Sequence, residues 1–554
     1  YDREQRHGSG GLSSNYLSYV TETPQVTEFL TQDAGVLATF DKPWGNLRAS
    51  VHHNWYIDQV KSLIFDSPFR VTDALTATVG TGTAATSVGG PSYGLMVNPP
   101  DNAATTGAFG ATIKLAHRTR VTGDVALSRW TQNDQLFPYI TNTAVVTPFV
   151  ASSVSSLPVQ SLNGKINTNS LVLAVTSKPV TRLNLAVRMR RYDLNNETPR
   201  ITFPATGSWD RSISTSNPRI TVPYSFTNTR VDATAGYDLK VVTIEGGLRH
   251  TAIDRTFREV EQTAETGASI AAVTHLWDNN VNLRAVYEKA SRDYSGLELE
   301  RSEDASFVTA PTGLSSNALN RDGSLRFDLA KRTTDRAGVN VDVSPIPMTT
   351  LAFSYFRNKD NYKETRYGVQ DASYDTYSGE VTFSPGEVWN VSAFYTREKN
   401  GSSQVNNGTS NFPTIDDFVV RLTDSAHTTG ATAMFTLVPA KVMLNLGGRY
   451  QNMEGTARFT TNPGSTYQLA RASLGGVQDI PNADNVKWTR LDASVDTTIT
   501  RRVTVTVGSW YEKYDFSDVD TAGLQNIYPG SFFLALNDWS YNATVAYVRL
   551  AYHW

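Results

Sequence analysis

The sequence predicts an all-β protein: a large antiparallel transmembrane β-barrel with short periplasmic turns and long extracellular loops. Three observations lead to this prediction. Apolar and polar residues alternate over repeated runs, the runs come in pairs around short turns, and long polar segments separate the pairs. An outer-membrane barrel combines these features because its strands turn alternate side chains to lipid and lumen, and because its turns are short on one side and long on the other.

Composition excludes several classes of protein. No run reaches the roughly 18 apolar residues of a transmembrane helix, and the mean hydropathy is −0.33. Lys and Arg (50) nearly cancel Asp and Glu (53) over 554 residues, so no basic field favours a nucleic-acid partner. The chain has no cysteine, which excludes disulfides, Cys-based metal sites and covalently attached haem c within it. It starts at Tyr1 without an apolar leader, and we expect a signal peptide to have been removed.

The expected hairpins follow one another along the chain. In the clearest one, the run at 171–176 is joined to the run at 183–190 by the turn at 177–181. Eight more turns are centred near Lys42, Thr119, Asp238, Asn279, Pro345, Pro385, Pro439 and Thr500. Proline suits such turns because its φ is fixed and it has no N–H to leave unpaired. Nine turns imply about 20 strands. This is a lower limit, because further hairpins could lie within 57–108, 131–170 and 291–331.

The remaining segments complete the barrel prediction. Polar stretches at 195–225, 295–321, 400–427 and 452–487 are expected to be extracellular loops. Aromatic residues near the expected strand ends predict an interfacial girdle, made of Trp44, Tyr192, Trp277, Tyr355, Trp389, Tyr450, Trp488 and Tyr511. In the last strand, at 543–554, one face carries Val548, Leu550 and Trp554, which looks like the C-terminal signal of bacterial outer-membrane barrels. We therefore predict the bacterial outer membrane as the location.

Two parts are expected along the chain. Residues 1–35 would form an N-terminal periplasmic or lumenal segment with the first strand, and residues 36–554 a single transmembrane β-barrel. Motifs that suggest enzymes lack their required context: Gly90–Gly94 matches G-x-S-x-G without a strand before it or a helix after it. The adjacent His52 and His53 would point to opposite faces of a strand. We expect no catalytic, cofactor or metal site, although calcium in the acidic loops stays open.

The candidate functional residues are polar residues in the lumen phase of the strands. They alternate with apolar residues in the lipid phase and carry charges of both signs, so the predicted lumen can contact water or a polar protein. The residues that we expect to contact a partner are Asn184, Arg188, Arg190, Arg284, Asn445, Arg449 and Arg549. Leu185, Leu444 and Val505 represent the lipid phase.

Several short strings, in order, resemble one known family. They include Thr131-Gln132-Asn133-Asp134, Arg191-Tyr192-Asp193 and Arg326-Phe327-Asp328-Leu329-Ala330-Lys331-Arg332. The chain resembles the MtrB/PioB barrels associated with decahaem cytochromes from about Gly8 to Trp554. The resemblance implies a barrel of about 26 strands (range 20–28) that sheathes a multihaem c-type cytochrome as an electron conduit. Haem c would then belong to the partner, outer-membrane lipid would surround the barrel, and an outer cell-surface cytochrome stays open as a further partner.

Two other functions remain as alternatives. A diffusive porin or solute channel would also have a polar lumen, although porins of 16 to 18 strands are smaller. A 22-stranded transporter would need an N-terminal plug, for which about 35 residues before the first clear hairpin are too few. A secreted β-rich protein is disfavoured by the closing strand.

Overall fold

The structure is a computed structural model of the chain. It describes residues 1–16, 19–66, 77–79, 86–88, 93–116, 118–208, 210, 212–277, 280–298, 301, 305–308, 326–363, 365–386, 388–407, 414–462, 477–518 and 540–552. Within these residues, strands dominate, and the only helices with assigned bounds are the 3-10 turns η2 (Val154–Ser156) and η4 (Thr414–Asp416). None of the helices found there is long and apolar enough to cross a membrane.

One antiparallel sheet of 20 strands makes up most of the described chain. Its strands, in chain order and in spatial order, are β1 (Asp2–Tyr16), β2 (Tyr19–Lys42), β3 (Gly45–Asp58), β8 (Asn102–Leu115), β9 (Thr119–Gln132), β10 (Gly164–Val180), β11 (Leu183–Asn196), β16 (Phe226–Asp238), β17 (Val242–Arg255), β18 (Val260–Leu276), β19 (Val281–Leu297), β20 (Lys331–Ile346), β21 (Thr349–Lys363), β22 (Gly368–Phe383), β23 (Trp389–Asn407), β24 (Asp417–Val438), β25 (Val442–Thr461), β26 (Val477–Thr500), β27 (Val503–Asp518) and β28 (Tyr541–Tyr552). Each strand pairs with the next one in this series, so the connection is a simple meander.

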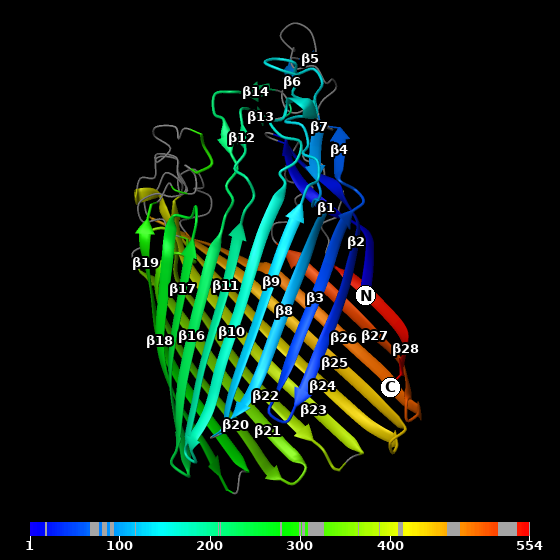
Figure 1. Ribbon diagram of the computed structural model, residues 1–554, viewed down its shortest axis with the longest axis vertical. Helices are drawn as coiled ribbons and strands as arrows, with labels where there is room; N and C mark the ends of the chain where they lie inside the picture. Colours follow the sequence, from blue (N-terminus) through cyan, green and yellow to red (C-terminus); the bar gives the residue numbers. More distant parts are fainter. Residues whose placement is uncertain are drawn as a thin grey trace.

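The sheet curls, and its long strands run together from the turn end at the bottom of Figure 1 to the loop end at the top. β1 pairs with β2 and β28 pairs with β27, and no pairing between β1 and β28 is seen in the described residues. Smaller two-stranded sheets lie at the loop end. They pair β4 (Ser62–Asp66) with β7 (Tyr93–Val97), β5 (Ala77–Val79) with β6 (Thr86–Val88), β12 (Thr202–Phe203) with β15 (Arg219–Ile220), and β13 (Thr206–Ser208) with β14 (Ser212–Ser214).

The nine predicted turns are confirmed by the strands that flank them, although Asn279, at the centre of one turn, lies outside the described residues. Each joins two consecutive strands of the sheet, from the turn between β2 and β3 near Lys42 to the turn between β26 and β27 near Thr500. The predicted all-β class is therefore confirmed, and the 20 strands match the lower limit of the predicted range. A count of about 26 is not confirmed. In their described parts, the segments 57–108, 131–170 and 291–331 add no strands to the sheet beyond those that follow from the nine turns.

Two of the predicted loops are wrong in extent. Residues 400–407 continue β23 and 417–427 belong to β24, and the ends of 452–487 likewise belong to β25 and β26. Polar residues can continue these strands because backbone pairing, and not lipid contact, holds a strand together beyond the membrane. The predicted boundary between 1–35 and 36–554 falls inside β2, whose partner strand β1 lies within the first segment.

The cross-strand register separates the sheet into two faces. Leu185 and Val187 of β11 lie on one face of the sheet, together with Val175 of β10, which pairs with Val187. Leu444 of β25 and Val505 of β27 lie on that same face. We call this the apolar face, because many of its large apolar side chains are exposed, including Leu248, Ile270, Leu351, Phe353, Leu491, Val548 and Leu550. Such exposure suits contact with lipid.

The girdle prediction is partly wrong. Tyr355, Trp389, Tyr450 and Tyr511 lie on the apolar face, but the register places Tyr192 and Trp488 on the opposite face. A position near a strand end does not by itself determine the face, because one residue of shift reverses it. Trp44 and Trp277 are exposed next to turns. In β28, Val548 and Leu550 lie on the apolar face as predicted, whereas Trp554 lies outside the described residues.

The nine turns should face the periplasm and the opposite loops the outside. Because the chain has no cysteine, single introduced thiols report on one site each. Thr181→Cys lies in the turn after β10, and Ser216→Cys lies in the loop between β11 and β16. On intact cells, a membrane-impermeant maleimide should label the Ser216 variant and leave the Thr181 variant unlabelled until the outer membrane is opened. Labelling of the turn variant alone would invert the predicted orientation.

Candidate functional site

The face opposite the apolar face is rich in polar and charged side chains, and we call it the polar face. The register places all seven predicted contact residues on it: Asn184, Arg188, Arg190, Arg284, Asn445, Arg449 and Arg549. They are spread over four strands, β11, β19, β25 and β28, and do not form one compact site. His52 lies on the polar face beside Asp33, while His53 lies on the other face beside Thr105, as expected for neighbours on a strand.

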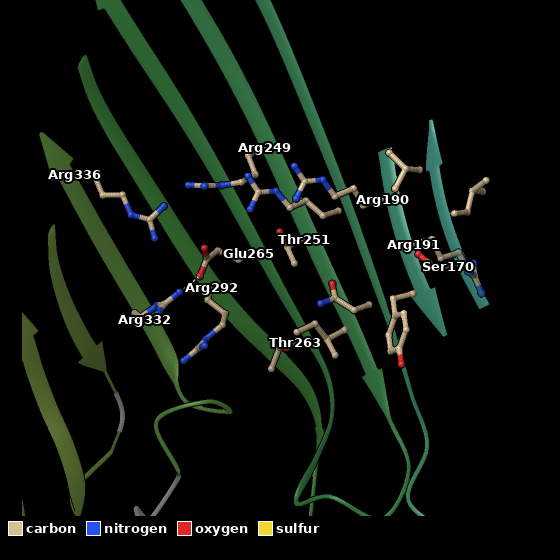
Figure 2. A pocket seen from close by; sticks show the side chains of 16 residues that line it. Ser170, Arg190, Arg191, Arg249, Thr251, Thr263, Glu265, Arg292, Arg332 and Arg336 are labelled. Atoms are coloured by element: carbon tan, nitrogen blue, oxygen red, sulfur yellow. Dashed lines mark hydrogen bonds and ion pairs between the residues drawn. The ribbon is translucent and has the colours of Figure 1, made fainter. Parts of the chain in front are cut away.

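A cluster of arginines lies on the polar face. It lines a cavity of about 540 Å³ along β11, β16, β17, β19 and β20. Figure 2 shows Arg249, Arg292, Arg332 and Arg336 around Glu265, with Ser170 and Arg191 apart from them at the right of the view. We call the arginines of this cavity on the polar face the arginine cluster: Arg190, Arg230, Arg249, Arg292, Arg332 and Arg336.

Carboxylates separate several of these guanidinium groups. Glu288 of β19 forms ion pairs with Arg249 and, at 3.2 Å, with Arg336. Glu265 of β18 pairs with Arg332, whose Nη1 also lies 3.5 Å from Asp360. These groups are largely buried, with side-chain exposures of 13 to 27%. Charge-assisted hydrogen bonds of this kind offset the repulsion between guanidinium groups, so several arginines can lie close together.

The other members of the cluster are held differently. Arg230 makes a two-pronged contact with Asp232 of its own strand, at 2.8 to 3.1 Å. Arg292 donates from Nε to the Ala330 carbonyl at 2.9 Å and from Nη2 to the Phe327 carbonyl. Arg190 forms no ion pair in the part of the chain that the structure describes, so its charge remains available on the polar face.

Sequence reasoning missed most of the arginine cluster. Arg190 was predicted, but Arg230, Arg249, Arg292, Arg332 and Arg336 were not, although each occupies the same alternating phase as its polar neighbours. A count of arginines in the lumen phase of successive strands could have revealed the cluster. Their pairing with acids could not have been predicted, because Arg332 and Glu265 are 67 residues apart in the chain.

The loop end of the sheet is organised by its own polar contacts. The Asp210 carboxylate accepts hydrogen bonds from the backbone N–H groups of Thr141, Asn142 and Tyr93, at 2.7 to 3.3 Å. It thereby connects the segment between β9 and β10 with two other loop segments. Ile140, Val145 and Ala151 form a small buried core in the same segment.

A second set of polar contacts, centred on Lys61 and called the clasp below, links the loop after β3 to the loop after β9. Lys61 contacts Asp101 and, at 2.9 Å, Asp134. Burial acts to raise the pKa of Asp134, but hydrogen bonds from Lys61 and the Asp101 backbone N–H outweigh it and lower that pKa below its ordinary value. A depressed carboxyl pKa contributes stability above the ordinary value of about 3.9. That stability is lost as the pH falls through the depressed pKa.

The clasp predicts a local response to acid. Pepsin digestion of the folded protein should leave the 133–163 segment protected at pH 5 and cleave it increasingly fast below about pH 4. Asp134→Asn, which cannot titrate, should show a much flatter pH profile for cleavage in this segment. Identical profiles for the two proteins would mean that Asp134 does not hold the loop.

No group of three or more His, Cys, Asp or Glu side chains suited to a metal ion occurs among the residues with described positions. The predicted contact residues lie along a long polar wall that extends over several strands. A comparison with protein families matches one whose description is "Putative outer membrane beta-barrel porin, MtrB/PioB", over residues 1–554. The chain belongs to the MtrB/PioB family of outer-membrane β-barrel porins. Its location in the bacterial outer membrane, predicted from the strands, is confirmed.

Comparisons with individual proteins find only distant similarity. No curated protein matches the chain. Among solved structures, the siderophore receptor PirA from Acinetobacter baumannii is 8% identical, with a TM-score of 0.43 over 99% of this chain and 80% of that one. The FrpB iron transporter from Neisseria meningitidis (F3-3 variant) is also 8% identical, with a TM-score of 0.43 over 91% and 73% of the two chains.

For this MtrB/PioB protein, the apolar face is the surface that meets lipid, and the polar face is the surface turned away from it. A spanning sheet with this division satisfies its backbone through neighbouring strands and presents its exposed apolar side chains to hydrocarbon. The polar face therefore holds the candidate functional residues of this porin.

Proposed function

We propose that this protein encloses a multihaem c-type cytochrome and insulates it within the outer membrane, forming an electron conduit for extracellular electron transfer. The observation that carries the proposal is the extended polar face, which bears charges of both signs along the strands from β11 to β28. Such a wall suits a folded, water-soluble protein surface better than it suits an apolar ligand.

Three further observations support the proposal. The chain belongs to the MtrB/PioB family, and its short strings resemble the members associated with decahaem cytochromes. The chain has no cysteine, so haem c cannot be attached to it through thioether bonds and would belong to the partner. A sheet of 20 strands, if closed, encloses more space than the porins of 16 to 18 strands.

In this role the protein performs no catalysis of its own. Its apolar face keeps the conduit in the bilayer, and its polar face positions the cytochrome and keeps lipid away from the haems. The loop end offers a place where an outer cell-surface cytochrome could receive electrons. The direction of electron flow is set by the donor and acceptor and not by this chain.

Reconstitution in liposomes tests the proposal. Vesicles with a trapped redox dye should show dye reduction by an external donor only when both this protein and a co-purified multihaem cytochrome are present. The protein alone should show no haem absorbance. If it instead admits small solutes freely and the cytochrome adds nothing to dye reduction, the protein is a diffusive porin.

A further inference from the structure

The polar face carries its charge unevenly. Along β11 to β20, several arginines are neutralised by acids: Arg230 by Asp232, Arg284 by Glu245, and Arg332 by Glu265. Four other guanidinium groups of the same arc have no acidic partner among the described residues: Arg188, Arg190, Arg255 and Arg292. Arg255 and Arg292 donate to carbonyl or hydroxyl oxygens instead. This arc therefore has a net positive charge.

The arc from β21 to β28 has the opposite balance. Its acids on the polar face outnumber its arginines, Arg449, Arg490 and Arg549, and comprise Asp360, Glu380, Glu398, Asp424, Asp492, Asp496 and Glu512. Only two of these acids pair with a basic side chain in the described part of the chain: Glu512 with Arg490, and Asp360 with Arg332 of the other arc.

Neutral donors hold some of the other acids in place. Asp496 accepts from Asn445 at 2.8 Å and from Thr506 at 2.5 Å, and Glu398 accepts from the Tyr374 hydroxyl at 2.7 Å. A hydroxyl or amide fixes a carboxylate without cancelling its charge. Arg449 leans over the Trp488 ring at 5.1 Å and makes no ion pair among the described residues. The negative charge of this arc is therefore retained on the wall.

We propose that these two arcs form a charge dipole that fixes the rotational orientation of the enclosed cytochrome. The inference rests on the proposed function and adds to it the chemistry of the docking surface. The partner would turn carboxylates, from acidic side chains or haem propionates, toward β11–β20, and would turn lysines or arginines toward β21–β28. Complementary charge of this kind sets orientation and specificity more than overall affinity.

The charge dipole acts only over a short distance from the wall. At physiological salt, charges are screened over about 8 Å, so only groups on a partner that lies against the wall feel one arc and not the other. A small solute in the middle of an open channel would experience little difference between the two arcs. A protein that fills the lumen displaces the screening water and is aligned by both arcs together.

Charge reversal tests the positive arc. Arg188→Glu with Arg190→Glu should lower retention of the co-purified cytochrome about tenfold at low salt. Most of this difference should disappear near 1 M NaCl, where screening acts over about 3 Å. Arg188→Lys with Arg190→Lys should retain the cytochrome. Arg449→Glu, on the negative arc, should not weaken retention, because it strengthens the charge already there. Equal loss for both reversals, or no loss for either, would overturn the dipole.

Cross-linking tests the orientation without altering the charges. Thr251→Cys lies in the arginine cavity, and Ser494→Cys lies beside Asn445 on the negative arc. A thiol-to-amine cross-linker should capture cytochrome lysines from position 494 and few from position 251. A thiol-to-carboxyl cross-linker should show the reverse. Equal yields at both positions would overturn the inference while leaving the sheath intact, whereas the absence of a bound cytochrome from the unmodified protein would contradict the proposed function itself.

Discussion

Leu446→Arg should destabilise the membrane-folded protein by about 2–4 kcal/mol, whereas Arg at the neighbouring Asn445 should be tolerated. Leu446 lies on the apolar face, where 40% of the residue is exposed and would meet lipid. A guanidinium there must leave water for hydrocarbon. Asn445 lies on the polar face and donates to Asp496 at 2.8 Å, so an arginine at 445 gains a carboxylate partner.

The two substitutions form a matched pair because they add the same side chain to adjacent residues of one strand. The free energy of unfolding can be measured by denaturant titration of each variant folded in lipid vesicles, with tryptophan fluorescence as the signal. A similar loss of stability for both would mean that β25 is buried on both sides, as in a sandwich. Tolerance of both would mean that Leu446 does not face lipid.

The fold was predictable where the determining pattern is local. A short stretch of sequence determines each of the nine hairpins, because the alternating residues and the turn residues are adjacent in the chain. The turn at Pro439, for example, follows directly from the two alternating runs beside it. Because a meander pairs every strand with the next, the local hairpins also determined most of the order of the sheet.

The predictions that were wrong or missing depend on pairing between strands, which the local sequence pattern does not contain. Strand length beyond the membrane was missed at 400–407, because polar residues pair through their backbones as readily as apolar ones. The face of Trp488 was wrong because its assignment needs the register with Gln451 on the next strand. The pairing of Arg332 with Glu265 depends on two intervening registers and could not be predicted from either residue alone.

The second large effect should appear at Glu288. This carboxylate stands between Arg249 and Arg336, and all three side chains are between 18 and 27% exposed. Glu288→Gln removes the charge that separates the two guanidinium groups while keeping the shape of the side chain. We expect the free energy of unfolding to fall by about 2–4 kcal/mol, because partly buried cations are then left without a counter-charge.

Glu245→Gln provides the matched control for this loss. Glu245 pairs with Arg284 at 2.8 Å on the same face, but the two side chains are 37% and 44% exposed. Water screens this pair, so its loss should cost less than about 1 kcal/mol. Adding Arg336→Gln to Glu288→Gln should restore part of the lost stability, since it removes one of the two uncompensated charges. If the double variant is no more stable than Glu288→Gln alone, repulsion between Arg249 and Arg336 is not the cause of the loss.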